Sequence, residues 1–550
     1  MNGKARGNHI WVAAVLGILL VAGPAVHCRA ANAPATDTLV TLGEAVYSTL
    51  SANPGVQIEK EAVVVTDGVV QTARGQFDWL FFSAARYGTE TLPVSESTQR
   101  AQSKAQADNN AIIDFMNTLP GANFPKNTGA IAEEIDERHT TISAGVMRQF
   151  MNGITVSPSA AVVDYENSYD HKDPASRSDV YVTMVIPMLR GLGEKATGAD
   201  YLAAESSRRA TVQISAHNIS QQVYGTVSAF WNCLAAQQSY ALAKDSFERA
   251  DFLLTHVSRM VDAGLVEPAF MNQARANLYA NRADLTKGEL AFRQRRQELA
   301  LTMGYGPDQM VVPPAPSGEF PIAPTGDAAS APAPEALIVR AKAKRQDYLA
   351  ALTSIDTQTI LFDKAQNNTK PRMDFSIQVG YAGIAENDDY SRYYRSFNNR
   401  LKGPNGYAGV TLELPIYNDA ARGQLVSQRA VVRQSKLSAA LLLNQIAADV
   451  MLAVNAENSA RSEYALAVQS AKAYQKAVAF EKKKYDAGES SLNALIDIED
   501  RFIKSRLTVI EAVRKYAVAR TQLLFATGAL LEENNGEFSF DPDRITKAFP

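Results

Sequence analysis

The sequence predicts a mainly α-helical protein that is duplicated internally and that contributes four β-strands per chain to a membrane β-barrel. A strand-like run ends at a proline and a very long helical pattern follows, first near Pro187 and again near Pro415. Both helical patterns break at the tripeptide Asp-Ala-Gly, and both then resume and end near a further glycine. Corresponding positions lie roughly 224 to 228 residues apart, as in an internal duplication. The repeated unit is therefore a large helix–hairpin–helix module.

The helical patterns are too long for a compact domain. Residues 424–487 contain neither Gly nor Pro, which corresponds to about 95 Å of helix at 1.5 Å per residue. Residues 489–527 are similarly unbroken, about 58 Å. Because such helices cannot be buried in one globular core, they must pack side by side as in a coiled coil. The sequence therefore predicts a coiled-coil-like array of long helices.

The first 30 residues have the pattern of a secretory signal peptide. Lys4 and Arg6 precede an apolar run over residues 10–21, and a small-residue stretch follows. Cleavage near Ala30 leaves Cys233 as the single cysteine of the mature chain, so no disulfide is expected. Cys28 leaves a lipoprotein signal open, although the residues before it lack the usual leucine.

No run of about twenty apolar residues follows the signal, so no helical membrane span is expected. The exported chain is then either soluble outside the inner membrane or inserted as a barrel. The formal net charge of −3 over 550 residues gives no reason to expect a nucleic-acid partner.

Nothing in the sequence indicates catalysis, a cofactor or a metal. The six histidines are scattered without ligand spacing, and no Ser or Cys nucleophile stands in a recognisable elbow. Gly191-Leu192-Gly193 follows a strand but lacks the third glycine and the βαβ context of a nucleotide site. We expect a protein that is not an enzyme.

The first repeat spans residues 38–303. We expect a helix pair over 38–72, a strand over 79–87, a second strand over 179–187, and two long helices over 200–263 and 265–303. Between the two strands lies an insertion, residues 92–178, which is polar and irregular. Within it we expect helices over 99–117 and 130–151.

A Pro-rich linker, residues 304–335, precedes the second repeat, residues 336–530. We expect in this repeat a helix over 336–366, strands over 374–381 and 407–414, and the two long helices already named. Residues 531–550 form a C-terminal tail.

The strands are predicted to have one apolar and one polar face. Phe375, Ile377 and Val379 alternate with polar neighbours, the period-two pattern of a strand. Four such strands cannot close a barrel, and open edges in lipid would leave backbone groups unpaired at several kcal/mol each. Several chains must therefore pool their strands, with the apolar face toward lipid and the polar face toward a wet lumen. The expected lumen residues are Asp374, Ser376, Gln378, Thr411 and Glu413, and the expected interfacial aromatics are Trp79, Tyr381 and Tyr407. The alternative is ordinary two-sheet strands over a helical core.

The motifs resemble the TolC-like outer-membrane efflux family. The most specific pieces are the run Tyr407-Ala-Gly-Val-Thr-Leu-Glu-Leu-Pro-Ile-Tyr417 and the run Lys484-Tyr485-Asp486-Ala487-Gly488, and the resemblance covers both repeats. It implies a homotrimer whose twelve-stranded outer-membrane barrel continues into a periplasmic α-helical tunnel. Pro187 and Pro415 would mark the joints between strand and helix, where a proline is tolerated in the first helical turn.

The resemblance also implies a gate at the periplasmic tip. Gly264 and Gly488 would form the tip turns. Tyr485 matches the family's gating tyrosine, and Asp497 matches the inner of two aspartates that face the lumen. The other positions of the family's polar lock are occupied by Ala494, Phe270 and Ser490, so the lock is incomplete. Glu267 or Glu489 would substitute, or a ring of Phe270 side chains would close the pore.

These expectations describe a passive exit duct for efflux or type I secretion in a Gram-negative outer membrane. Its partners would be a periplasmic adaptor protein, an inner-membrane transporter of the RND or ABC class, and outer-membrane lipid. The insertion over 92–178 would be extracellular, as a cap, a plug or a partner site. The alternative function is an exported trimeric coiled-coil scaffold or adhesin without a pore.

Overall fold

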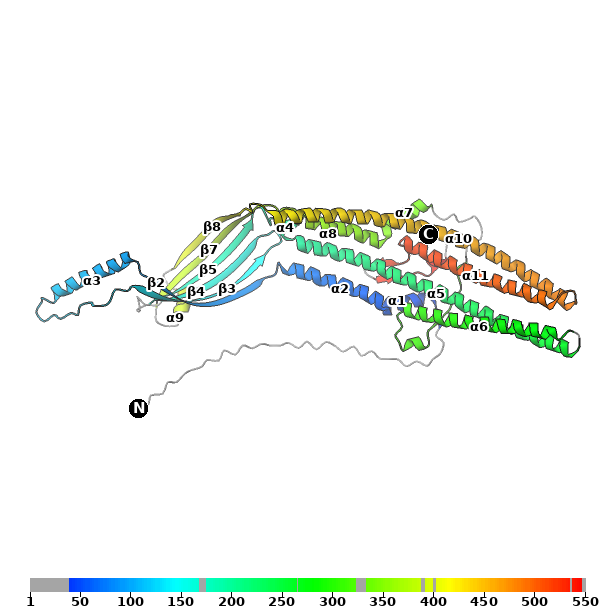
Figure 1. Cartoon of the computed structure of the whole chain (residues 1–550). Coiled ribbons are helices and arrows are strands. Elements are labelled where there is room, and N and C mark those ends of the chain that lie inside the picture. Colours follow the sequence, from blue (N-terminus) through cyan, green and yellow to red (C-terminus); the bar gives the residue numbers. More distant parts are fainter. Residues whose placement is uncertain are drawn as a thin grey trace, which may run out of the picture.

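The computed structural model describes residues 39–167, 175–264, 266–322, 333–386, 391–398, 402–534 and 537–546. The predicted signal peptide, residues 1–30, lies outside the described residues. The molecule is elongated, with a β-sheet toward one end and a long helical array at the other (Figure 1). The prediction of a mainly helical protein with long helices and antiparallel strands is confirmed.

A single six-stranded antiparallel sheet forms the β-region. Its strands, in spatial order, are β2 (Leu80–Pro93), β3 (Glu134–Gln149), β4 (Thr155–Asn167), β5 (Ala175–Pro187), β7 (Arg372–Glu386) and β8 (Lys402–Glu413). The four expected strands are present as β2, β5, β7 and β8. The prediction of four strands per chain is nevertheless wrong, because β3 and β4 of the insertion join the same sheet. The expected twelve-stranded barrel assumed four strands per chain, so the strand number on which it rests differs from the six in this sheet.

Of the two helices expected in the insertion, one is present and the other is a strand. A helix is present as α3 (Glu96–Met116), close to the expected 99–117. The second expected helix, over 130–151, is instead strand β3. Within it Ile142, Ala144 and Val146 alternate with Ser143 and Gly145, and this period-two pattern favours a strand. The rest of the insertion extends the sheet and projects α3 beyond it (Figure 1).

The first repeat begins with a capped helix pair. Thr41 accepts a hydrogen bond from the Glu44 backbone N–H, and the Glu44 carboxylate accepts one from the Thr41 N–H at 2.8 Å. This capping box starts α1 (Leu42–Ala52). Asn53 then separates α1 from α2 (Pro54–Gly75), which has its proline in the first turn. After β5 come the short α4 (Glu194–Thr197) and the long pair α5 (Ala199–Asp262) and α6 (Ala269–Thr302).

The second repeat has the same plan. Its elements are α7 (Pro334–Lys344), α8 (Gln346–Asn368), the hairpin β7–β8, α10 (Asp419–Asp486) and α11 (Leu492–Ala526). The helix predicted over 336–366 is interrupted at Arg345, which has extended backbone. This break corresponds to the one at Asn53 in the first repeat. A short helix, α9 (Ser391–Asn398), lies within the β7–β8 connection and packs on β5 and β7.

The middle of the molecule holds the largest apolar core. Val227, Phe230 and Leu299 of the first repeat pack there with Leu524 and Leu530 of the second. Part of the predicted linker is also docked, because β6 (Ala315–Pro316) pairs in parallel with β1 (Leu39–Val40). The short 3-10 helix η1 (Gln309–Val311) precedes β6. In the tail, β9 (Glu532–Asn534) pairs with β10 (Glu537–Ser539), and α12 (Asp543–Thr546) buries Ile545 in the same core.

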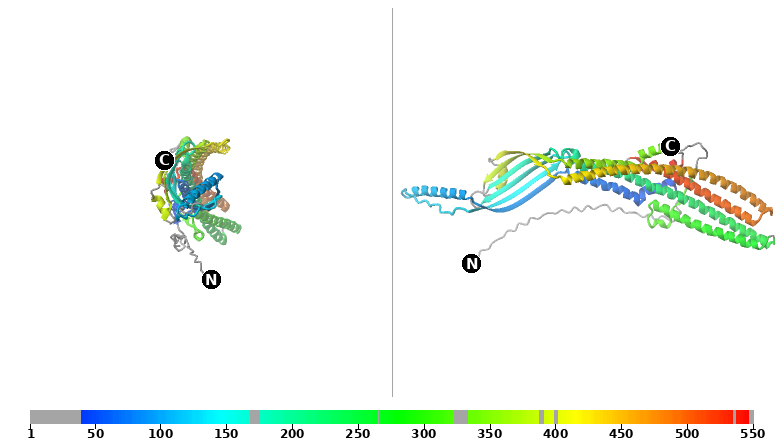
Figure 2. Two further views of the ribbon diagram at one scale, coloured as in Figure 1. Left: turned by 90° about the vertical axis from the view of Figure 1, so that its left-hand side faces the viewer. Right: turned by 45° about the horizontal axis from the view of Figure 1, so that its top comes forward.

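The helices are arranged in the order of the strands to which they connect. Next to the sheet the order is α2, α5, α8, α10, and toward the far tip it is α6, α5, α11, α10. One edge of the molecule is therefore formed by β2, α2 and α6, and the other by β8 and α10. Seen along its length, the chain curves into an arc (Figure 2, left).

Among the described helices, only α10 is long and apolar enough by composition to cross a membrane. Apolar side chains of α10 pack against other helices of the chain. Ile446 and Val450 pack in a core with Leu337 and Leu523, so this helix belongs to the helical array.

Candidate functional site

The sheet has two chemically distinct faces. Cross-strand pairing places Val182 beside Val379, and Phe375 beside Val410. These residues lie on the apolar face, together with Val180, Met184, Ile377, Ala408 and Leu412. On the opposite, polar face Asp374 pairs with Thr411 and Gln378 with Tyr407. The expected lumen residues Asp374, Ser376, Gln378, Thr411 and Glu413 thus share one face.

The two unexpected strands continue the same pattern. Val146 of β3 pairs with Phe81 of β2, and Ala144 pairs with Ala160 of β4. These residues lie on the apolar face, in line with Val180 and Val182 of β5. Because the apolar face runs unbroken from β2 to β8, the insertion strands widen the wall that the other four strands form.

The three expected interfacial aromatic residues separate in the structure. Tyr381 lies on the apolar face beside Val180, in agreement with the expectation. Tyr407 lies on the polar face opposite Gln378, so it does not share the face of Tyr381. Trp79 precedes β2 and lies under the Arg148 guanidinium, 5.6 Å from the ring centroid.

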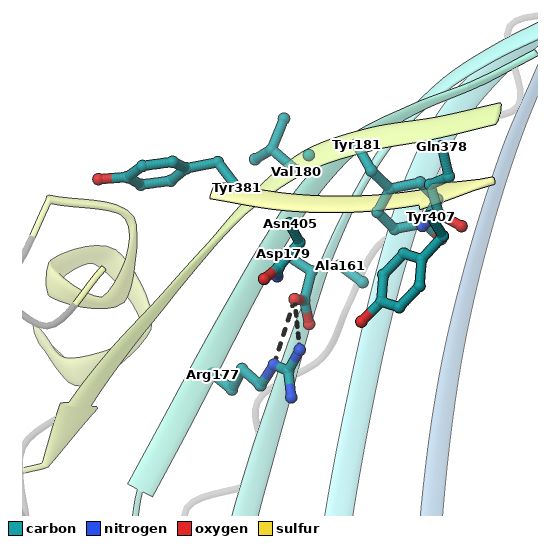
Figure 3. A pocket seen from close by; sticks show the side chains of 10 residues that line it. Ala161, Arg177, Asp179, Val180, Tyr181, Gln378, Tyr381, Asn405 and Tyr407 are labelled. Atoms are coloured by element: carbon teal, nitrogen blue, oxygen red, sulfur yellow. Dashed lines mark hydrogen bonds and ion pairs between the residues drawn. The ribbon is translucent and has the colours of Figure 1, made fainter. Parts of the chain in front are cut away.

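The polar face carries a small cavity of about 280 Å³ (Figure 3). Arg177 and Asp179 line it from β5, and the Arg177 Nη2 to Asp179 Oδ1 distance is 3.0 Å. Tyr181 and Tyr407 add two aromatic rings on the same side of the sheet. Charged, amide and aromatic groups therefore line this cavity on the polar face.

The two tip turns are built in the same way. At Gly488 the backbone φ is +78°, and its N–H donates to the Tyr485 carbonyl at 2.9 Å. At Gly264 φ is +73°, and its N–H donates to the Val261 carbonyl at 2.9 Å. This left-handed conformation is one that glycine adopts without a steric penalty. Both glycines lie in turns between long helices, at the end of the molecule farthest from the sheet (Figure 1). The two predicted turns are therefore present at that end.

Phe270 and Tyr485 lie in one apolar cluster at the tip. They pack from α6 and α10 onto a buried core of Val257, Ala274 and Leu492. Burial of the phenol, with a smaller contribution from Asp486, raises the pKa of Tyr485. Phe270 thus packs in a cluster that joins the two hairpins of one chain. The expected ring of Phe270 side chains around a pore stays a prediction.

The predicted acidic gate residues are solvent-exposed. Asp497 is 63% exposed and is paired with Arg501, with 2.9 Å between Oδ2 and Nε. Glu267 and Glu489 lie at the two tip turns and are also exposed. Ser490 is partly buried and donates to Glu481. The structure therefore places Asp497, Glu267 and Glu489 near one tip but brings none of them into contact with another.

Two further carboxylates at the tip were missed by the sequence reasoning. Burial raises the pKa of Glu499, with Arg249 and Lys482 opposing the shift. Burial also raises the pKa of Asp500, and the nearby Asp497 and Asp284 add to this shift. Glu499 and Asp500 follow Asp497 on α11, and the acidic run 497–500 was the signal that could have indicated them.

The two predicted joints lie where the strands end. Pro187 is the last residue of β5 and Pro415 follows β8 by two residues. The helices begin later, at Ala199 and Asp419, so the placement of these prolines in a first helical turn is wrong. They mark strand ends because proline lacks the N–H that a continuing ladder needs. Asn418, with φ +53°, reorients the chain before α10, and its Nδ2 donates to the Thr369 carbonyl at 2.9 Å.

No protein-family model matches the chain. Over 197 residues the chain is 28% identical to the fusaric acid resistance protein FusA of Burkholderia cepacia. The matched stretch covers 35% of this chain and about a third (34%) of the length of that protein.

Solved structures match over most of the chain. The outer membrane channel CmeC of Campylobacter jejuni has a TM-score of 0.59 at 14% identity, covering 89% of this chain and 85% of that one. The outer membrane channel MtrE of Neisseria gonorrhoeae has a TM-score of 0.57 at 14% identity, covering 88% of each chain. At this level of identity the likeness concerns the fold.

Proposed function

We propose that this chain, which has the fold of the TolC-like outer-membrane channels, acts as the outer-membrane exit duct of a tripartite efflux system. Three copies form a closed tube that passes through the outer membrane as a β-barrel and through the periplasm as a helical tunnel. The observation that carries the proposal is the open sheet, with one apolar face, one polar face and two unpaired edge strands.

The open edges support assembly from several copies. Neither the outer edge of β2 nor that of β8 has a strand partner in the described part of the chain. In lipid each unpaired backbone group costs several kcal/mol, so β2 of one copy must pair with β8 of the next. Six strands from each of three copies give an eighteen-stranded barrel, an even number as in other outer-membrane barrels.

Both edges of the helical array, α2 and α10, carry exposed apolar side chains. On α2 the exposed residues Ile58, Val65 and Val69 lie on one helical face. On the opposite edge, α10 exposes Leu437 and Leu441 beside a groove. Exposed apolar surface of this extent on a soluble helical array favours burial against another chain. In a ring of copies, α2 of one chain meets α10 of its neighbour directly below the paired strands.

The tip is the gate, and the duct is passive. Phe270 and Tyr485 hold the two hairpins of one chain together, so a change in the angle between hairpins disturbs that cluster. Asp497, Glu267 and Glu489 supply exposed negative charge at the same end. Energy for transport comes from an inner-membrane transporter of the RND or ABC class, coupled by a periplasmic adaptor.

Small organic molecules are the favoured cargo. The curated relative is named for resistance to fusaric acid, a small molecule, and the match supports efflux over protein secretion. A deletion strain should become more sensitive to small toxic acids, and wild-type gene expression should restore resistance. Unchanged sensitivity together with loss of a secreted polypeptide would favour type I secretion.

Conductance tests the duct itself. The protein purified in detergent should have the mass of three chains, and it should form discrete channels in planar bilayers. The rival function is an exported trimeric scaffold or adhesin without a pore. A trimer that remains non-conducting after disruption of the tip cluster with Phe270→Asp would contradict the duct and support the scaffold.

A further inference from the structure

An apolar seam on α3 has no partner in the described chain. Ile112, Phe115 and Leu119 are 57%, 73% and 56% exposed, although all three are large apolar side chains. Ile112 and Phe115 continue the spacings of four and three residues that begin with Ala101, Ala105 and Asp108, the heptad pattern of a coiled-coil seam, and Leu119 lies in the turn just beyond the end of α3 at Met116. We refer to these six residues as the α3 seam.

The opposite side of α3 is already occupied by its own chain. Gln106 donates to the Gly129 carbonyl at 2.8 Å, and Asn110 donates to the Asn127 carbonyl at 2.7 Å. The Asn127 N–H returns a hydrogen bond to Asn110 Oδ1 at 2.8 Å. These contacts fix the rotation of α3 about its axis, so that the seam faces away from the chain that carries it.

The seam is continuous with an edge that requires another copy of the chain. Val94 follows β2, and its N–H donates to the Glu133 carbonyl at 2.8 Å, so the β2–β3 ladder runs up to the base of α3. Helix α3 therefore grows out of the strand that pairs with β8 of the neighbouring copy. Seen along the molecule, α3 lies on the open side of the arc, which is the side of the central axis (Figure 2, left).

The dimensions allow the three helices to meet. An eighteen-stranded barrel with strands about 4.8 Å apart and tilted about 40° has a radius of roughly 18 Å. The 21 residues of α3 extend roughly 31 Å at 1.5 Å per residue. The length of α3 exceeds this radius, so an inward lean of the helix, which projects beyond the sheet (Figure 1), is sufficient to bring the three copies together at the axis.

We propose that three copies of α3 pack against one another through the α3 seam and form a helical cap over the outer mouth of the barrel. This inference rests on the proposed three-copy duct. Asp108 is the one charged residue of the seam, and three such carboxylates facing each other weaken the contact at that level. The apolar end of the seam, from Ile112 to Leu119, carries the association.

Cross-linking of introduced cysteines tests the cap. Residue Cys233 is buried and its pKa is raised to about 12 by burial, so it does not compete as a reactive thiol. In the assembled protein, Ile112→Cys should be joined between chains by a short bismaleimide. Because each chain carries one reactive thiol, only pairs of chains form. The matched control is Ser103→Cys, which is exposed on the side of α3 turned away from the seam.

We expect about tenfold more cross-linked dimer from Ile112→Cys than from Ser103→Cys, because only seam positions approach each other. Phe115→Cys serves as a second seam position if Ile112→Cys assembles poorly. A protein with the mass of three chains in which neither seam variant exceeds the control would overturn the cap and leave the duct standing. A protein that is monomeric in native mass would contradict the duct itself.

Discussion

Gly304 and Gly528 occupy equivalent places in the two repeats and contact equivalent breaks between helices. Each ends a long helix with positive φ, +85° and +67°. A Cβ added at Gly304 would lie 2.6 Å from the Asn53 backbone, and one added at Gly528 would lie 3.0 Å from the Arg345 nitrogen. The duplication therefore preserves a backbone packing contact as well as a sequence pattern.

Gly528→Ala should destabilise the protein more than Gly488→Ala. Both positions have positive φ, so both variants incur backbone strain of about 1 kcal/mol. Only Gly528 also lacks room, because its Cβ would meet the Lys344 carbonyl carbon at 2.9 Å, whereas nothing lies within 4 Å at Gly488. Thermal unfolding of the two variants measures the difference. An equal loss of stability in both variants would show that the backbone around Gly528 accommodates the added Cβ without a cost in free energy.

Arg520→Met should cost about 3–5 kcal/mol, because it breaks a buried ion pair. Arg520 Nη1 lies 3.2 Å from Glu457 Oε1, and the two side chains are 4% and 2% exposed. The pair joins α10 to α11. In the single variant the buried Glu457 carboxylate still has the partly exposed Arg461, whose Nη2 lies 3.5 Å from Oε1. The double variant Arg520→Met/Glu457→Leu should recover much of the loss, since it removes the buried carboxylate. The free energies of unfolding of the two variants test this explanation. A double variant that is no more stable than the single variant would contradict it.

Glu499→Gln should stabilise the protein at neutral pH. Burial raises the folded-state pKa of Glu499 above 4.5, so ionisation opposes folding once the pH exceeds the folded pKa. As the pH falls below 4.5 the carboxyl is protonated in both states, and the advantage of the variant should disappear. Unfolding temperature against pH measures this. An unfolding temperature of the variant that follows that of the wild type at every pH would contradict this prediction.

Ala144→Arg should block stable insertion into outer membranes, whereas the adjacent Ser143→Arg should be tolerated. Ala144 lies on the apolar face between Ser83 and Ala160, and Ser143 lies on the polar face between Ala84 and Ala161. An arginine facing lipid near the midplane costs about 2–4 kcal/mol. Heat-resistant assembled protein in membrane fractions is the measurement. Equal assembly of both variants would mean that β3 does not span the membrane.

Asp497→Ala should reduce the cation selectivity of the channel and its block by multivalent cations. The side chain is exposed at the tip, where three copies would form a ring of charge. Reversal potentials in a salt gradient measure the selectivity. Glu298→Ala, an exposed carboxylate farther along α6, is the control. If both variants retain full selectivity, Asp497 lies outside the lumen.

The sequence was sufficient for the duplication, the long helices and four strands, because these depend on uninterrupted local patterns. It was insufficient for β3, since near its outer end Arg138, His139 and Thr140 place polar groups on both faces. The break at Arg345 was also missed, because neither Gly nor Pro marks it. Tertiary ion pairs hold it instead: Arg345 contacts Asp347 at 2.7 Å and Asp449 at 3.1 Å.

The candidate site was less predictable than the fold. Turn chemistry located Gly264 and Gly488, because a left-handed helix end requires glycine. The environment of Phe270 depends on residues from three different helices, and no local pattern encodes it. The exposure of Asp497 and the burial of Glu499, two residues apart on one helix, likewise follow from which neighbours pack against α11.

Because α10 is uninterrupted, a small rotation of this helix at mid-height moves its far end by a larger distance. It passes the level of Arg345 without a break, although α7 and α8 are interrupted there. From Asp449 to Asp486 it extends roughly 55 Å, so a swing of about 10° at the Arg345 contact displaces the tip by roughly 10 Å. A partner that shifts the helices slightly at mid-height would therefore change the width of the far opening by more than the diameter of a small solute.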